Sequence, residues 1–76
     1  MSKLPIVTSL KLEKFLLHLG FAIKRQKGSH VFYRHPDGRY TTIPMHGNQI
    51  LSRPLIRQIL REINISPEDY IDFFNK

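Results

Sequence analysis

Four histidines are the residues of this chain best suited to proton transfer, and one of them lies in a strongly basic segment. Residues 24–46 contain five Lys or Arg side chains and one acid, Asp37, and they place His30 directly after a Lys-Gly-Ser turn at 27–29. An unperturbed imidazole titrates at about pH 6.5, so it can accept or donate a proton near neutrality. A histidine in a positive surface is therefore suited to chemistry on a phosphodiester backbone.

The simplest chemistry of this kind is the cleavage of RNA by internal attack. A base removes the proton of a ribose 2′-OH, and the oxygen attacks the neighbouring phosphorus. Cations stabilise the added negative charge while an acid protonates the leaving oxygen. DNA has no 2′-OH, so this route is specific for RNA, and it requires no metal. His30 is the candidate catalytic residue; the alternative is a histidine that packs beside the turn or hydrogen-bonds its backbone.

The other three histidines are weaker candidates. His46 follows the third expected strand, whose end should lie beside the start of the second. It could act there as a second proton carrier or phosphate contact, and loop packing is the alternative. His35 precedes a proline, as a strand-end residue does, and His18 lies near a helix C-terminus. No two histidines have the H-x-x-x-H spacing of a helical metal site and the chain has no cysteine, so we predict neither a metal site nor a cofactor.

The expected RNA contacts are the basic and turn residues around His30, together with one residue after the third strand. They are Lys24, Arg25, Lys27, Gly28, Ser29, Arg34 and His46. Phe32, Tyr33 and Tyr40 could also stack on unpaired bases, but in so small a protein we favour core packing for them.

The length of 76 residues predicts one domain, residues 1–76, with a single small core. Its net charge of +6 is unevenly spread, because residues 1–61 hold nearly all the cations and residues 62–76 hold four of the six acids. A basic body suggests a polyanionic partner, although an acidic protein would suit the same surface. No apolar stretch approaches the roughly 18 residues of a membrane span, so we expect a cytoplasmic protein without membrane association.

The pattern of apolar and turn residues predicts a helix, three strands and a second helix, followed by a short third helix. The first helix follows Thr8 as N-cap and ends at Gly20, and the strands are expected at 21–26, 30–35 and 39–44. Ser52 and Ser66 are the expected N-caps of the later helices. Alternation along the second strand places His30, Phe32 and Arg34 on one face and Val31, Tyr33 and His35 on the other.

Three antiparallel strands must bury one face, and the two longer helices are the available cover. We therefore predict an α+β fold of α-β-β-β-α order, with a three-stranded antiparallel sheet, helices on one face and a short C-terminal helix. This is the arrangement of the double-stranded-RNA-binding domain.

These residues resemble the HicA (YcfA-like) family of toxins from bacterial and archaeal toxin–antitoxin systems. The matching segments are Leu-Gly-Phe at 19–21, Arg-Gln-Lys-Gly-Ser-His at 25–30, Phe32, His35-Pro36 and Ile43-Pro44-x-His46. The resemblance implies a double-stranded-RNA-binding-domain-like fold, cleavage of mRNA without the ribosome, and His30 as the catalytic residue. It also implies a HicB-type antitoxin that covers the active surface. Many members carry a second histidine or similar polar residue where this chain has Val31.

Three hypotheses follow. The first is a metal-independent endoribonuclease toxin, an mRNA interferase, with His30 as general acid or base. The second is a non-catalytic RNA-binding module that uses the same basic surface. The third is a protein-interaction domain whose cations meet an acidic partner.

Overall fold

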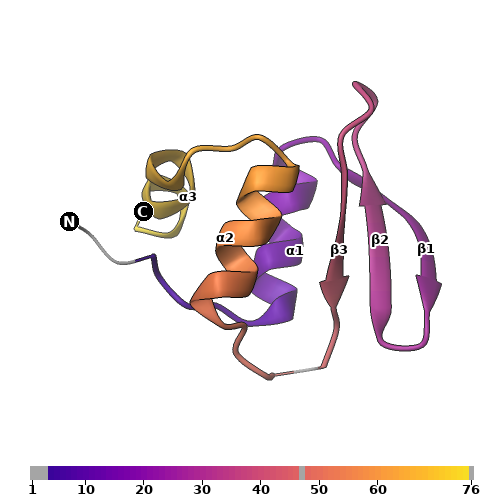
Figure 1. The fold of residues 1–76 in the computed structure, drawn as a ribbon, viewed down its shortest axis with the longest axis horizontal. Coiled ribbons are helices and arrows are strands. Elements are labelled where there is room, and N and C mark those ends of the chain that lie inside the picture. The colour runs from indigo at the N-terminus through magenta and orange to yellow at the C-terminus, as the bar shows by residue number, and fades with distance from the viewer. Residues whose placement is uncertain (1–3, 47, 76) are drawn as a thin grey trace.

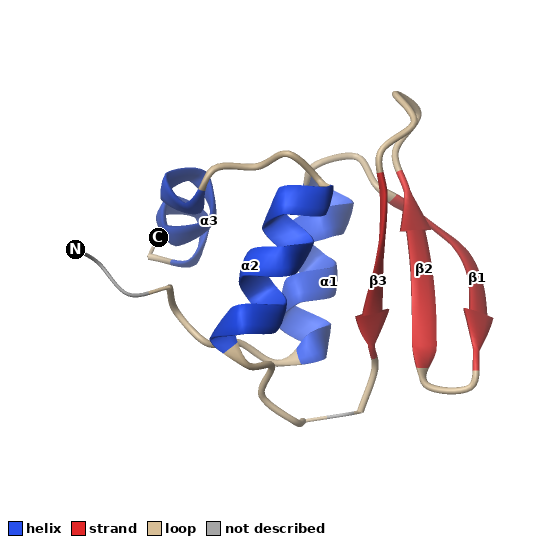
Figure 2. Ribbon diagram, viewed as in Figure 1, coloured by secondary structure: helices blue, strands red, loops and turns tan. Residues whose placement is uncertain are grey.

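The structure, a computed structural model, describes residues 4–46 and 48–75. Its elements follow the expected order, with three helices and three strands (Figure 1, Figure 2). They are α1 (Ser9–His18), β1 (Ala22–Lys27), β2 (His30–Arg34), β3 (Tyr40–Pro44), α2 (Arg53–Glu62) and α3 (Pro67–Phe74). The α+β class and the α-β-β-β-α order are confirmed, and both are compatible with a double-stranded-RNA-binding-domain-like fold.

Each helix begins at a hydroxyl side chain that caps its first turn. The hydroxyl of Thr8 accepts a hydrogen bond from the backbone N–H of Lys11, at 3.2 Å, and Ser52 and Ser66 cap α2 and α3 in the same way. Each cap stabilises its helix by about 1 kcal/mol. After α1 the chain reverses at Gly20, whose φ of +101° favours glycine, so the expected caps and helix end are confirmed.

The strands form one antiparallel sheet in the order β1-β2-β3. A two-residue turn joins β1 to β2, and Gly28 takes a φ of +59° at its first position, as glycine does in type II′ hairpins. Lys27 was predicted to lie in this turn, but it is paired with His30 and belongs to β1. The turn therefore has two residues, Gly28 and Ser29, instead of the three that we predicted. At the other end the strands are shorter than predicted, because Phe21, His35 and Arg39 lie outside them.

The helices cover one face of β2 and β3 and leave β1 exposed. Val31 and Tyr33 of β2 and Ile43 of β3 are buried in one core with apolar residues of α1 and α2. Every residue of β1 is exposed, and in Figure 1 this strand lies farthest from the helices. The opposite face of the sheet, together with all of β1, is therefore open to a ligand.

Aromatic packing holds the short helix α3 against α1. The ring of Phe15 in α1 lies 5.0 to 5.8 Å, centroid to centroid, from those of Tyr70, Phe73 and Phe74. Such pairs add about 0.5–1.5 kcal/mol each beyond the area that they bury. The acidic C-terminal segment is thus a packed part of the fold.

Candidate functional site

The open face of the sheet carries the side chains that the sequence singled out on β2. His30 and Arg34 are exposed and Phe32 is half-buried, whereas Val31 and Tyr33, which alternate with them, are buried against the helices. The predicted alternation is thus confirmed for these five residues. It places His30 at the start of β2, on the uncovered face, at the end of the sheet that holds the β1–β2 turn.

Two basic residues of β1, Arg25 and Lys27, share this face with His30, and a bulge separates them from the start of the strand. Ile23 pairs with Tyr33 and Arg25 pairs with Phe32, so Lys24 is an extra residue between them. In a regular strand, residues 23 and 25 would lie on the same face. The bulge instead turns Ile23 toward the helix side, while pairing with Phe32 and His30 keeps Arg25 and Lys27 on the open side. The sequence pattern did not predict this bulge.

Direct cross-strand pairs define the geometry of the open face. His30 pairs with Lys27 on one side and with Pro44 on the other, and Phe32 lies between Arg25 and Thr42 in the same way. Directly opposite residues have Cβ atoms about 4.5–5.5 Å apart, so the Lys27 ammonium can reach an anion that also contacts the His30 imidazole. A second cation is held over the face, because the guanidinium carbon of Arg25 lies 4.7 Å from the centroid of the Phe32 ring.

The His30 imidazole is accessible. In the part of the chain that the structure describes, its side chain makes no hydrogen bond or ion pair, so neither ring nitrogen is occupied by another protein group. The turn beside it is held by other groups: the side-chain amide of Gln26 donates a hydrogen bond to the carbonyl of Gly28, at 3.1 Å. The ring can therefore meet a ligand without first breaking a contact within the protein.

His46 lies on a segment that leaves β3 beside the β1–β2 turn. The backbone N–H of Met45 donates a hydrogen bond to the carbonyl of Ser29, at 2.6 Å, and exposed His46 is the next residue. Because Ser29 directly precedes His30, the chain brings both histidines to the same end of the sheet, as expected. Gly47 lies outside the described residues.

His35 connects the end of β2 to the end of α1. Its Nε2 lies 3.1 Å from the carbonyl oxygen of Leu19, and its Nδ1 lies 3.1 Å from the backbone nitrogen of Asp37. The Leu19 carbonyl oxygen can only accept a hydrogen bond, so Nε2 donates one to it, and Nδ1 also lies 3.0 Å from Oδ1 of Asp37. His35 also packs edge-on against Phe21, with ring centroids 5.1 Å apart, so its role is structural.

The turn between β2 and β3 forms a further structural cluster, at the opposite end of the sheet from His30. Arg39 donates to the Asp37 carboxylate at 2.8 Å, lies over the Phe21 ring and also donates to the carbonyl of Ile63 at the end of α2. The hydrogen bond from the Arg39 backbone N–H holds the pKa of Asp37 below its usual range. The Asp37 carboxylate and the Arg39 guanidinium therefore stabilise this turn.

Tyr33 lies on the covered face and is excluded from the open one. Only 1% of its surface is exposed, and its hydroxyl donates to Glu13 of α1 at 2.6 Å. Burial raises the pKa of this phenol far above its usual value, and the hydrogen bond to Glu13 acts in the same direction. Core packing is thus right for Tyr33 but wrong for Tyr40, which is 72% exposed at the start of β3, and only partly right for Phe32. The helices cover only one face of the sheet, and Tyr40 and Phe32 lie on the other.

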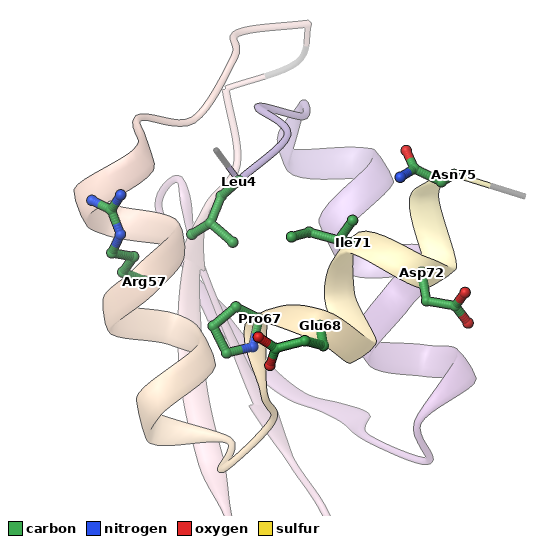
Figure 3. A pocket seen from close by; sticks show the side chains of 7 residues that line it. All are labelled: Leu4, Arg57, Pro67, Glu68, Ile71, Asp72 and Asn75. Carbon is green, nitrogen blue, oxygen red and sulfur yellow. The ribbon is translucent and has the colours of Figure 1, made fainter. Parts of the chain in front are cut away.

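A further hollow of about 740 Å³ lies elsewhere, between α2 and α3 (Figure 3). Figure 3 shows Leu4 and Ile71 facing each other across it, with Arg57 on the α2 side and Glu68 on the α3 side. Its mixed charge and its distance from the sheet separate it from the His30 face. Among the described residues, no three His, Cys, Asp or Glu side chains are grouped as metal ligands would be.

The fold and this face define a small α+β protein with an accessible histidine in a basic surface. The model of the HicA family, the HicA toxin of bacterial toxin–antitoxin systems, matches residues 10–65, and the chain belongs to this family. The membership supports a toxin role and implies an antitoxin partner. No curated protein matches the chain. None of the helices in the described residues is long and apolar enough to span a membrane.

Proposed function

We propose that this toxin is a metal-independent endoribonuclease that cleaves mRNA in the cytoplasm, with His30 as its general acid or base. The observation that carries the proposal is the pairing of exposed His30 with Lys27 on the open face of the sheet. An exposed imidazole whose nitrogens are not engaged by any residue that the structure describes and a neighbouring ammonium supply the proton carrier and the positive charge that internal attack on RNA requires.

The proposed reaction is a transesterification within the RNA chain. A base removes the proton of a ribose 2′-OH, the O2′–P bond forms, and the P–O5′ bond breaks. The leaving 5′ oxygen then takes up a proton, so the products are a 2′,3′-cyclic phosphate and a 5′-OH end. His30 carries one of these protons, and His46, at the same end of the sheet, is our candidate for the other. The cations Lys24, Arg25, Lys27 and Arg34 bind and polarise phosphates, while Gly28 and Ser29 let the backbone approach.

The antitoxin partner that the family implies is proposed to cover this same face. Four cations surround His30 on β1 and β2, and residues 21–36 contain no acid, so an acidic surface of a HicB-type antitoxin would complement it. We further propose that residues 1–76 act as one HicA-like domain, because α3 packs on α1 beyond the matched segment.

The test is cleavage of a single-stranded RNA in EDTA by the wild-type protein and by two histidine variants. His30→Ala is expected to lower the rate by roughly 10² to 10⁴, the usual contribution of a positioned acid or base. His18→Ala is the matched control, because His18 is an exposed histidine at the end of α1 and lies against Phe73. A substrate with 2′-H at the cleavage position should remain intact.

Two other results would favour the alternatives. Equal RNA binding by wild-type protein and His30→Ala, with no cleavage by either, supports a non-catalytic RNA-binding module. If the protein does not bind RNA at low salt, the result supports a domain that binds an acidic protein partner. Circular dichroism of each variant verifies that the fold is retained.

A further inference from the structure

Two aromatic side chains on the open face of the sheet have no part in proton transfer. Tyr40 is 72% exposed and Phe32 is half-buried, although their neighbour Tyr33 is fully packed in the core. Tyr and Phe rings bury well in a small protein, so a largely exposed tyrosine beside a second accessible ring suggests contact with a partner.

These rings lie on the same face as His30 and close to it. Phe32 is two residues after His30 on β2, which separates the two residues by about 6.6–6.8 Å along the strand. Arg34 comes next on this face, and its direct partner across the ladder is Tyr40. A nucleotide whose phosphate lies at His30 can therefore extend its base, or the base of its neighbour, over Phe32 toward Tyr40.

A shallow hollow joins the two rings. Its volume is about 440 Å³, and Phe32, Tyr40 and Thr42 contribute to its lining. This is within the roughly 300–1,000 Å³ of ordinary small-ligand sites. Its rim is cationic, because Lys24, Arg25 and Arg34 line it as well.

The charges of this face favour a polyanion. The acids near this face are engaged by other groups. Asp37, in the turn that joins Arg34 to Tyr40, is paired with Arg39, and Glu13 and Glu62 accept hydrogen bonds from Tyr33 and Thr41. The guanidinium of Arg25 already lies over the Phe32 ring, so one planar cation occupies a stacking position there. Arginine planes and aromatic rings are the two kinds of surface on which proteins stack unpaired bases.

We infer that this hollow, formed by Phe32, Tyr40 and the Arg25 guanidinium, binds one unpaired nucleobase of the RNA next to the phosphate at His30. The substrate class is therefore single-stranded RNA, because a base within a duplex cannot present its face to these rings. The inference rests on the proposed function for the position of the cut, but base binding itself does not depend on cleavage.

Binding is tested in the His30→Ala protein, which cannot consume the RNA by the proposed route. Fluorescence anisotropy with a labelled single-stranded RNA measures affinity, and 2-aminopurine at successive positions reports stacking through quenching. Tyr40→Ser and Phe32→Leu are each expected to weaken binding about tenfold and to relieve the quenching at one position. Tyr40→Phe keeps the ring and should bind as well as Tyr40.

Ile23→Ser is the matched control, because Ile23 is 51% exposed on the same sheet but faces the helix side. It should leave affinity and quenching unchanged, and a duplex of the same sequence should bind more weakly than the single strand. Equal affinities of the Tyr40→Ser, Phe32→Leu and parent proteins would overturn the base site, as would a preference for duplex.

The two proposals fail separately. If cleavage in EDTA depends on His30 but neither ring affects binding, the ribonuclease proposal stands and the base site is contradicted. If quenching depends on the rings but no cleavage is seen, the base site stands and the ribonuclease proposal is contradicted.

Discussion

His30 and Lys27 are direct partners across the β1–β2 ladder, one residue on each side of the two-residue turn, and both are exposed. The pairing places an ammonium beside an imidazole at the end of an uncovered sheet. The two-residue turn fixes this pairing, whereas the bulge at Lys24 changes the face that the earlier residues of β1, Ala22 and Ile23, present. One phosphate can therefore contact the side chains of both Lys27 and His30.

The first prediction concerns the phosphate contact of Lys27. In the His30→Ala background, Lys27→Ala should weaken binding of single-stranded RNA and make the slope of log K against log salt less steep by about 0.7, the loss of one phosphate contact. Arg61→Ala is the control, because Arg61 is exposed on α2 beside α3, away from the sheet. An equal change of slope for both variants would mean that net charge alone drives binding.

The second prediction separates two histidines of the same hairpin. His35→Ala removes the hydrogen bond to Leu19 and the ring contact with Phe21, so it should lower the free energy of unfolding by about 1–3 kcal/mol. Its cleavage rate should equal that of the wild type at temperatures where it is folded. His30→Ala should show the reverse, with stability retained and cleavage lost. Urea unfolding and the cleavage assay measure the two effects, and loss of cleavage in a folded His35→Ala protein would contradict the structural role.

The third prediction compares two glycines with the same positive φ angle. Gly20 and Gly38 both have a φ of +101°, so alanine at either should cost about 1–2 kcal/mol of backbone strain. A Cβ at Gly20 would also lie 3.0 Å from Nε2 of His35, whereas a Cβ at Gly38 would meet nothing within 4 Å. Gly20→Ala should therefore be less stable than Gly38→Ala by about a further 1 kcal/mol or more.

A double-mutant cycle assigns this difference. Combining Gly20→Ala with His35→Ala removes the ring that the new methyl group would meet, so the two effects should not add. Additive losses of unfolding free energy would show that the contact with His35 contributes nothing.

The fourth prediction concerns stability in alkali. Burial raises the pKa of Tyr70 to about 12, while an unfolded tyrosine titrates at about 10. Between about pH 10 and 12, the folded protein keeps a proton that the unfolded chain releases, so the free energy of unfolding falls by up to about 1.4 kcal/mol per pH unit for this group. The contribution is fully present below about pH 10. Tyr33, whose pKa is also raised, adds to the slope in the same direction.

Tyr70→Phe tests this assignment, because phenylalanine keeps the ring packing but cannot ionise. It loses the hydrogen bond to the Pro5 carbonyl, which should cost about 1 kcal/mol near neutral pH. Above about pH 10 its stability should fall less steeply than that of the wild type. Urea unfolding at several pH values measures both slopes, and parallel slopes would contradict the assignment.

The sequence by itself determined the local structure. Hydroxyl residues before apolar stripes specified the helix starts, Gly20 specified a helix end, and strict alternation from His30 to Arg34 separated the two faces of β2. These signals are local, because each depends on hydrogen bonds or side-chain directions within a few residues. Two tight turns in succession were enough to predict an antiparallel sheet, and the residues of the Gly-Ser-His segment were enough to indicate the family.

Only the tertiary structure decided which residues meet across the fold. Alternation shows that Phe32 and Tyr33 face opposite ways, but only the packing of α1 and α2 buries Tyr33 and leaves Tyr40 exposed. His35 and Leu19 come together because helix and hairpin pack at one corner. The bulge at Lys24 depends on pairing with β2, and it places Ile23 and Arg25 on opposite faces of the sheet. Contacts of this kind join residues that are distant in the chain or depend on the register of two strands, so no local pattern specifies them.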